Sequence, residues 1–251
     1  MTSKNGSSVL HSAADGKHAE AVRLMLVVGL DVHAKDNRGL TALDSALQRM
    51  SNIDFVPMLP VVDALLEAGA HVSDSARQFM RVANERFEFH RAGFNKDMVE
   101  ETSAAMLKLC ERLGVEAAAQ RTVHDGVSPI VATSVTWQKQ HAELWNLLVP
   151  SKGACVTMQG EVVRIAGRIG DEMFRNGGMN WDAEYKAMGD AFRLYLASHN
   201  ALDEASLQRC KQTLSRLPKS DEETDVLARM AVKWVALNPQ PIALPAPAYT
   251  R

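Results

Sequence analysis

The chain has 251 residues, of which 46% are hydrophobic, and its 28 Lys and Arg nearly balance its 30 Asp and Glu. This composition is typical of a globular protein with one large domain or two smaller ones. Acidic residues stand among all the basic clusters, which argues against binding to nucleic acid through phosphate neutralisation. Residues 1–20 lack a basic segment followed by an apolar stretch, and no apolar run approaches the roughly 20 residues that cross a bilayer. We therefore expect a cytoplasmic protein without a membrane partner.

The three cysteines, Cys110, Cys155 and Cys210, are too few and too far apart for a disulfide framework or a four-thiolate zinc site. A reducing compartment fits this cysteine usage. The sequence predicts no metal site and no cofactor.

Internal repetition begins near the amino terminus. Residues 6–14 (GSSVLHSAA) align with residues 39–47 (GLTALDSAL), 33 positions later. Ser8 and Thr41 stand where they can cap a helix, whereas Gly29 and Gly69 can adopt the positive φ that ends one. The apolar residues between these signals recur at helical spacing. Each copy is therefore expected to form two helices whose apolar faces need a neighbouring repeat.

This pattern resembles the ankyrin repeat, which has the same period and a Thr-Pro-Leu-His-like start to its first helix. A degenerate third copy ends at Gly114 after an insertion near residues 87–94, and a fourth is expected over residues 124–149. The second copy departs from the family in its insertion with Pro57 and Pro60 and in Asp44, which replaces the usual His. His11 keeps that His and is expected to bond the backbone of the neighbouring loop.

Residues 157–237 carry no visible repeat but predict four helices. The expected caps are Thr157, Asn180, Asp203 and a Ser220–Glu223 capping box. These helices are expected to form a small bundle or a cap on the last repeat. Residues 238–251 contain four of the nine prolines, so they are predicted to be extended, either as a strap along their own domain or as a disordered end.

The expected fold is therefore all-α, an ankyrin-like α-solenoid of about four degenerate repeats followed by a helical bundle. The expected domains are an ankyrin-repeat domain over residues 1–154, a helical domain over 155–237 and an extended tail over 238–251.

The ankyrin resemblance implies a non-enzymatic protein that binds another folded protein through its hairpin tips and inner helix face. An adaptor or inhibitor from a bacterial or phage setting is one special case. Polar residues that do not serve the core define the expected partner-binding set: His33, Lys35, Asn37, Arg38, Gln48, Arg49, His71, Asp74, His124 and Asp125.

Two alternatives remain open. An enzyme or small-ligand site in the C-terminal helices would use Glu161, Arg164, Arg168, Asp171 and Glu172, although pairs three and four residues apart are typical of solvated ion pairs on a helix surface. A pocket that encloses them against Tyr185 or Trp181 would favour this alternative. The other is a self-associating scaffold, a homo-oligomer that pairs its C-terminal helices, and a solution mass near 27 kDa would contradict it.

Overall fold

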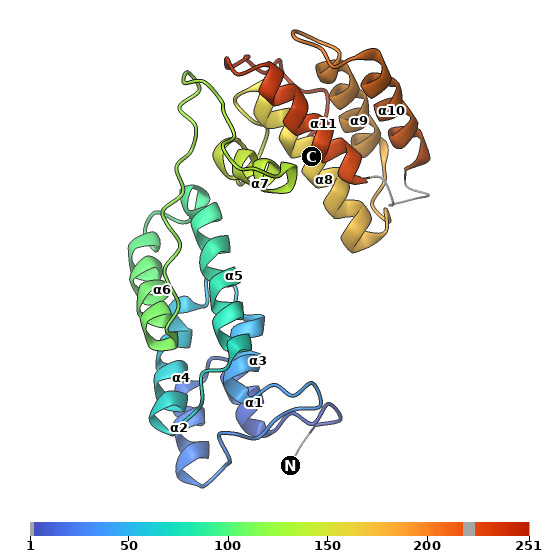
Figure 1. The fold of residues 1–251 in the computed structure, drawn as a ribbon. Coiled ribbons are helices and arrows are strands. Elements are labelled where there is room, and N and C mark those ends of the chain that lie inside the picture. The colour runs from blue at the N-terminus through green and yellow to red at the C-terminus, as the bar shows by residue number, and fades with distance from the viewer. Residues whose placement is uncertain (1–2, 218–223, 251) are drawn as a thin grey trace. The chain divides into compact units, whose positions relative to one another are not determined.

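The computed structural model describes residues 3–217 and 224–250, and it divides into two compact units, Met1–Gln120 and Arg121–Arg251 (Figure 1). Within those ranges the regular structure is helical, and the single strand-like pairing is an isolated bridge between Thr157 and Ala243. The expected all-α class is confirmed.

Unit 1 stacks paired helices in two layers. The first layer contains α1 (Val9–Asp15), α3 (Ala42–Arg49) and α5 (Asp74–His90), and the second contains α2 (Ala19–Val27), α4 (Phe55–Glu67) and α6 (Val99–Leu113) (Figure 1). Each helix packs on the next member of its own layer. The apolar faces thereby close into one core, as expected for repeats that cannot bury these faces alone.

Hydrogen bonds between repeats link the helix starts of unit 1. The buried His11 contacts the Leu40 carbonyl through Nε2 at 3.0 Å, as the sequence predicts. Asp44, the equivalent residue one repeat later, accepts a hydrogen bond from the hydroxyl of Ser73, the cap of α5. A carboxylate can only accept, so the partner changes from a carbonyl to a hydroxyl. Asp44 therefore differs from the usual His but still links its repeat to the next one.

The third pair of helices, α5 and α6, is longer than the first two and is interrupted by a 3-10 turn, Arg91–Gly93. Phe87 anchors this pair, since its ring makes edge contacts with Phe55 at 5.5 Å and with Phe94 at 5.4 Å. Arg91 closes the insertion by donating to Glu88 at 2.8 and 2.6 Å. The insertion expected near residues 87–94 is thus a helix extension followed by a short turn.

Unit 2 begins 34 residues before the expected domain boundary, at Arg121 instead of residue 155. It contains α7 (Trp137–Leu148), α8 (Met158–Asn176), α9 (Ala183–Leu196), α10 (Glu204–Arg216) and α11 (Thr224–Leu237). Helix α8 packs against α7, α9 and α11 and forms the centre of the unit.

The expected fourth ankyrin copy has only its second helix. Residues 121–136 are not helical, and α7 packs on α8 and α11. In place of a first helix, this segment is extended around Ile130, whose amide donates to the carbonyl of residue 239 at 2.7 Å. The local likeness of residues 124–132 to a repeat start therefore does not produce a repeat.

The helix caps of unit 2 follow the sequence in two of the three cases that the structure describes. Thr157 accepts from the Gly160 amide at 3.2 Å and Asp203 from the Ser206 amide at 2.8 Å. The cap of α9 is Asp182 instead of Asn180, because Asn180 is bound to the carboxylate of Glu172. The predicted Ser220–Glu223 capping box lies outside the described residues.

The ion pair between Glu161 and Arg164 is buried, contrary to the solvated pair expected from its spacing. Glu161 and Arg164 are 0% and 1% exposed, and the guanidinium donates to the carboxylate at 2.9 and 2.5 Å. Tyr249 donates a third hydrogen bond to Glu161 at 2.7 Å. Burial alone would raise the pKa of Glu161, but these bonds and the charge of Arg164 hold that pKa below its ordinary value of 4.5.

Glu172 also differs from the expected pair with Arg168, because it is buried and accepts from the side chains of Asn176 and Asn180. Asp171 is exposed and pairs with Arg175 at 2.6 Å. The five residues of the alternative C-terminal site therefore do not form one row, and three of them serve separate contacts within the helix bundle.

The tail after α11 is a strap along unit 2. The side-chain nitrogen of Gln159 donates to the carbonyls of residues 238 and 240, and its oxygen accepts from the Ile242 amide at 3.1 Å. Farther along, Tyr249 bonds Glu161, and the Thr250 amide donates to Glu184 at 2.6 Å. Of the two forms expected for these residues, the strap is the one that the structure has.

All three cysteines are buried and free. Burial raises the pKa of the Cys110 and Cys210 thiols to about 11 and also raises that of Cys155. Since the thiolate is the nucleophilic form, all three thiols are unreactive at neutral pH.

Replacing Asp44 by Ala should destabilise unit 1. The change leaves the Thr41 amide and the Ser73 hydroxyl without their acceptor, so we expect a loss of about 2 kcal/mol. Urea denaturation followed by far-UV circular dichroism measures this loss. All four tryptophans (residues 137, 145, 181 and 234) lie in unit 2, so the fluorescence transition should stay unchanged. An unaltered dichroism midpoint, or the same effect from Asp97→Ala on the surface, would contradict the assignment.

Replacing Glu161 by Gln should lower the midpoint of the tryptophan transition. It leaves Arg164 buried without a counter-charge, at a cost of about 3 kcal/mol. Asp171→Asn on the same helix removes an exposed ion pair and is the matched control.

The depressed pKa of Glu161 also gives a pH dependence. Its stabilisation is complete above the unfolded pKa, near 4.5, and is lost as the pH falls through the lower folded value. The difference in stability between the chain and its Glu161→Gln variant should therefore shrink below pH 4.5. A constant difference across this range would show that the carboxylate is not the stabilising group.

Candidate protein-interaction surface

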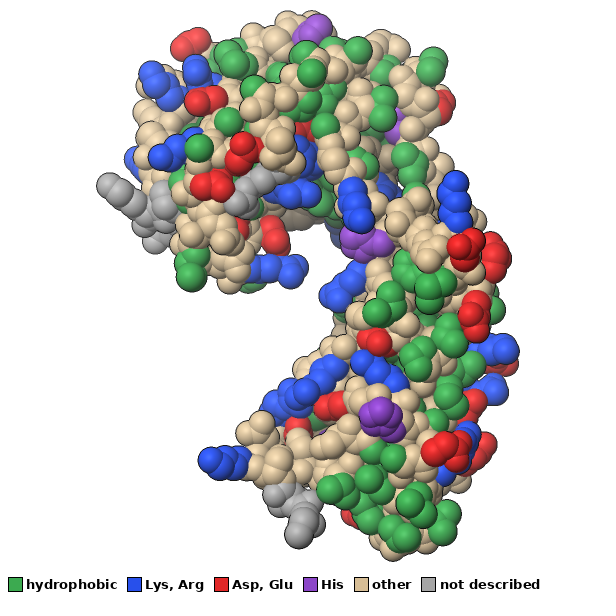
Figure 2. All heavy atoms as spheres, turned by 180° about the vertical axis from the view of Figure 1, so that it is seen from behind, with side chains coloured by type: hydrophobic (Ala, Val, Ile, Leu, Met, Phe, Trp, Pro, Cys, Tyr) green, Lys and Arg blue, Asp and Glu red, His purple; other side chains and the backbone are tan. Residues whose placement is uncertain are grey.

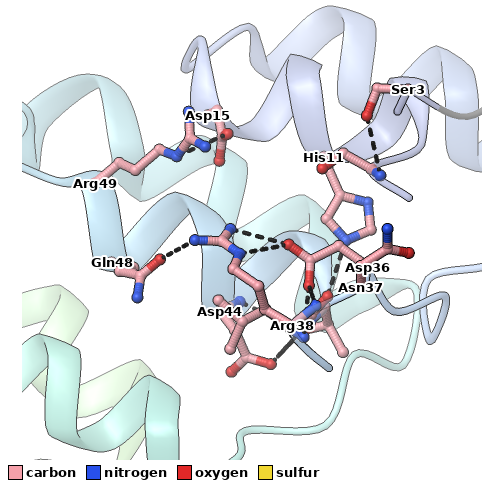
Figure 3. A network of polar contacts seen from close by, with 12 residues as sticks. Ser3, His11, Asp15, Asp36, Asn37, Arg38, Asp44, Gln48 and Arg49 are labelled. Carbon is pink, nitrogen blue, oxygen red and sulfur yellow. Dashed lines mark hydrogen bonds and ion pairs between the residues drawn. The ribbon is translucent and has the colours of Figure 1, made fainter. Parts of the chain in front are cut away.

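The hairpin between α2 and α3 is organised around Asp36. This buried carboxylate accepts from the amides of Arg38 at 2.9 Å and Leu40 at 3.0 Å, and from Arg38 Nε at 3.0 Å (Figure 3). Burial would raise the pKa of Asp36, but the hydrogen bonds from Leu40 and Arg38 and the charge of Arg38 outweigh it and lower that pKa. The tip of the hairpin is therefore held in one conformation by an ionised side chain.

Arg38 connects this hairpin to the inner helix layer. Its Nη1 donates to Gln48 Oε1 on α3 at 2.8 Å (Figure 3). The neighbouring Arg49 pairs with Asp15 of α1 at 3.3 Å. Three of the expected partner-binding residues, Arg38, Gln48 and Arg49, thus lie together on the first two repeats and link the hairpin to the ends of α1 and α3.

Asn37 is a structural contact of the same hairpin. Its backbone amide donates to the Asn5 carbonyl at 3.0 Å. Gly6 makes this approach possible, because it has φ +74° and a Cβ there would lie 2.3 Å from Asn37 Oδ1. Asn37 therefore joins the segment before α1 to the hairpin, a role that its exposed position does not reveal in the sequence.

His33, Lys35 and His71 have exposed side chains on the hairpins. None of the three side chains makes a hydrogen bond or ion pair with another described residue. Asp74 is also exposed and pairs with Arg77 at 3.2 Å in the first turn of α5. Of the residues expected to bind a partner, these four have side chains that are exposed to solvent on or next to the hairpins.

Arg81 is a surface residue that the sequence analysis missed. It lies eight positions after its cap Ser73, as Arg49 does after Thr41, so the two arginines are equivalent in their repeats. Arg81 is exposed and its Nη1 contacts Gln78 at 3.1 Å. Counting from the cap, instead of searching for the lost tetrapeptide, would have found it.

His124 and Asp125 belong to unit 2 and are not part of this surface. The Asp125 carboxylate accepts from the amides of Val127 and Ser128, both at 2.8 Å, and from the Ser128 hydroxyl. These bonds lower the pKa of Asp125. His124 bonds the Ser128 carbonyl and the Gly126 amide. Both residues thus shape a turn that was expected to be a repeat hairpin.

The described residues contain no group of three or more His, Cys, Asp or Glu side chains arranged to hold a metal ion. Among the helices of residues 3–217 and 224–250, none combines the length and apolar character that crossing a membrane requires.

Charge reversal at two hairpin positions should distinguish a side chain that stabilises the hairpin from one that does not. Arg38→Glu places a carboxylate beside Asp36 and Gln48, so we expect unit 1 to unfold at lower urea, since like charges repel and the Gln48 bond is lost. Lys35→Glu changes an exposed side chain that has no partner among the described residues, so the dichroism transition should not move. Equal shifts for the two variants would contradict the role given to Arg38.

Comparison with known proteins supports the repeat assignment at the start of the chain. Residues 1–46 match the family model described as ankyrin repeats, many copies. No curated protein and no solved structure matches the chain. The resemblance found in residues 6–47 is confirmed, and in unit 1 the paired helices and their links continue beyond the matched segment. The similarity to ankyrin repeats is therefore shown for residues 1–46 of the chain.

Proposed function

We propose that unit 1 binds a folded protein through its hairpin tips and the exposed ends of its inner helices, and that the chain acts as an adaptor or inhibitor. Ankyrin repeats generally mediate protein–protein interaction and are typically non-enzymatic. The observation that carries the proposal is a fixed hairpin with exposed, unpartnered side chains: Asp36 holds the loop, and Lys35 and His33 project from it.

Rigidity favours binding at such a surface. The network of Asp36, Arg38 and Gln48 orders the loop before a partner arrives, and Asn37 fixes the segment that precedes α1. A surface that is already ordered loses little conformational entropy on association. Its side chains therefore contribute more of their contact energy to affinity.

The charge of the surface favours an acidic partner. Asp36 and Asp15 are each neutralised by an arginine of the same surface, whereas Lys35 and Arg81 have no carboxylate partner among the described residues. Figure 2 shows Lys and Arg side chains, with Asp or Glu side chains among them, along the edge of unit 1 from which the hairpins project. Complementary charge speeds association and selects among partners more than it adds affinity.

The test compares proteins captured by the full chain and by a Lys35→Glu, Arg81→Glu double variant. Quantitative mass spectrometry of affinity captures from the native host should show specific proteins that the variant loses at least about tenfold, equivalent to about 1.4 kcal/mol. The variant must first show an unchanged dichroism transition. Raising the salt concentration should weaken the same captures, because exposed charges are screened.

Arg175→Glu in unit 2 is the matched control, since it also reverses an exposed arginine. The proposal fails if both variants lose the same proteins equally. It fails as well if the double variant keeps every protein that the unaltered chain captures.

The self-associating scaffold remains a prediction, and it requires a solution mass above that of one chain. An enzyme site built on the five α8 residues loses its geometric basis, because Glu161 with Arg164 and Glu172 with Asn180 are committed to internal contacts.

A further inference from the structure

An open groove of about 520 Å³ lies between α9 and α10 in unit 2. Its volume falls in the range of small-molecule sites. The floor is formed by buried and half-buried residues, and charged side chains stand at the rims. The residues on which the argument rests are Trp181, Tyr185, Lys186, Gly189, Arg193 and Lys211.

The spacing of these residues places several of them on the same wall of the groove. Positions 185, 189 and 193 are four apart and therefore lie along one side of α9, and Trp181 lies four positions earlier, just before the helix. Gly189 lies on the floor, where a Cβ would be 3.3 Å from a methyl group of Leu214 on α10. A glycine at this position thus keeps the two helices close while the groove stays open above them.

The groove carries excess positive charge. Lys186, Arg193 and Lys211 are exposed and make no ion pair or hydrogen bond through their side chains with other described residues, whereas Asp190 is the one carboxylate among the lining residues. Of the described carboxylates at the start of α9, Glu184 accepts from the Thr250 amide and Asp182 caps the helix. Three cations around one groove favour an anionic ligand.

An aromatic pair lies at the beginning of α9. The rings of Trp181 and Tyr185 are stacked, with centroids 5.4 Å apart and planes inclined by 13°. Tyr185 is buried, so it fixes the indole from below, while Trp181 is half-buried and keeps part of its surface accessible. A fixed indole is a platform for a planar ring, and stacking on such a platform contributes about 1–3 kcal/mol per base.

We propose that the groove between α9 and α10 binds a nucleoside monophosphate. The base stacks on Trp181, and the phosphate lies among Lys186, Arg193 and Lys211. Asp190 accepts a hydrogen bond from the sugar or from an exocyclic amino group. This site is separate from the protein-interaction surface of unit 1 and does not depend on it.

Isothermal titration calorimetry of the full chain with AMP, GMP, CMP and UMP tests the proposal. At least one nucleotide should bind more tightly than both its nucleoside and inorganic phosphate, since the groove requires both parts. Lys211→Gln and Arg193→Gln should each raise the dissociation constant about tenfold. Both side chains are exposed, so these variants should keep the dichroism spectrum of the unaltered chain. Trp181→Ala should weaken the nucleotide but leave the affinity for inorganic phosphate unchanged.

Arg175→Gln, on the exposed end of α8, is the matched control and should bind as the unaltered chain does. The proposal is overturned if none of the four nucleotides binds at a concentration of about 5 mM. This concentration is well above the dissociation constants of ordinary ligands. It is also overturned if inorganic phosphate binds as tightly as the nucleotides, or if a single-stranded oligonucleotide binds and the mononucleotides do not. Equal weakening by Lys211→Gln and Arg175→Gln would show non-specific charge attraction and would equally overturn it.

Discussion

The hydrogen bond that crosses from one repeat to the next holds unit 1 in register. Apolar contact alone is not directional, and it would allow the helix pairs to slide against one another. His11 with Leu40, then Asp44 with Ser73, fix the start of each inner helix relative to its neighbour. Asn84, within α5, makes a different link by donating to the carbonyl of Glu116 and accepting from the amide of Ala118, beyond the end of α6. The hairpin that carries Lys35 and Arg38 is positioned by the first of these links, so the proposed binding surface depends on them.

The sequence predicted those parts of the fold that rest on local signals. Thr41, Thr157 and Asp203 cap helices as expected, because a cap needs only its own side chain and the next turn. The repeat start predicted at residues 124–132 was wrong for the opposite reason. Their resemblance to a repeat start is local, whereas the Ile130 amide is bonded to the carbonyl of residue 239, more than a hundred positions away.

The candidate sites show the same limit. Spacing identifies Glu161 and Arg164 as a pair but does not tell which side of α8 faces the core, so a buried ion pair looked like a solvated one. Its third member, Tyr249, is 88 residues from Glu161. On the hairpin, Asn37 was expected to serve a partner because it is polar, whereas the bond from its backbone amide to the Asn5 carbonyl is visible only in the folded chain.

Because of the strap along unit 2, the two units can complete their contacts at different stages of synthesis. The links between repeats join residues about 30 positions apart, so unit 1 can assemble while later residues are still being added to the growing polypeptide. The core around α8 has to wait, because Glu161 and Arg164 lack their Tyr249 cover until residue 249 has left the ribosome. Until then Glu161 lacks the hydrogen bond from Tyr249 and Gln159 lacks its carbonyl partners in the tail, so unit 2 completes its core later than unit 1.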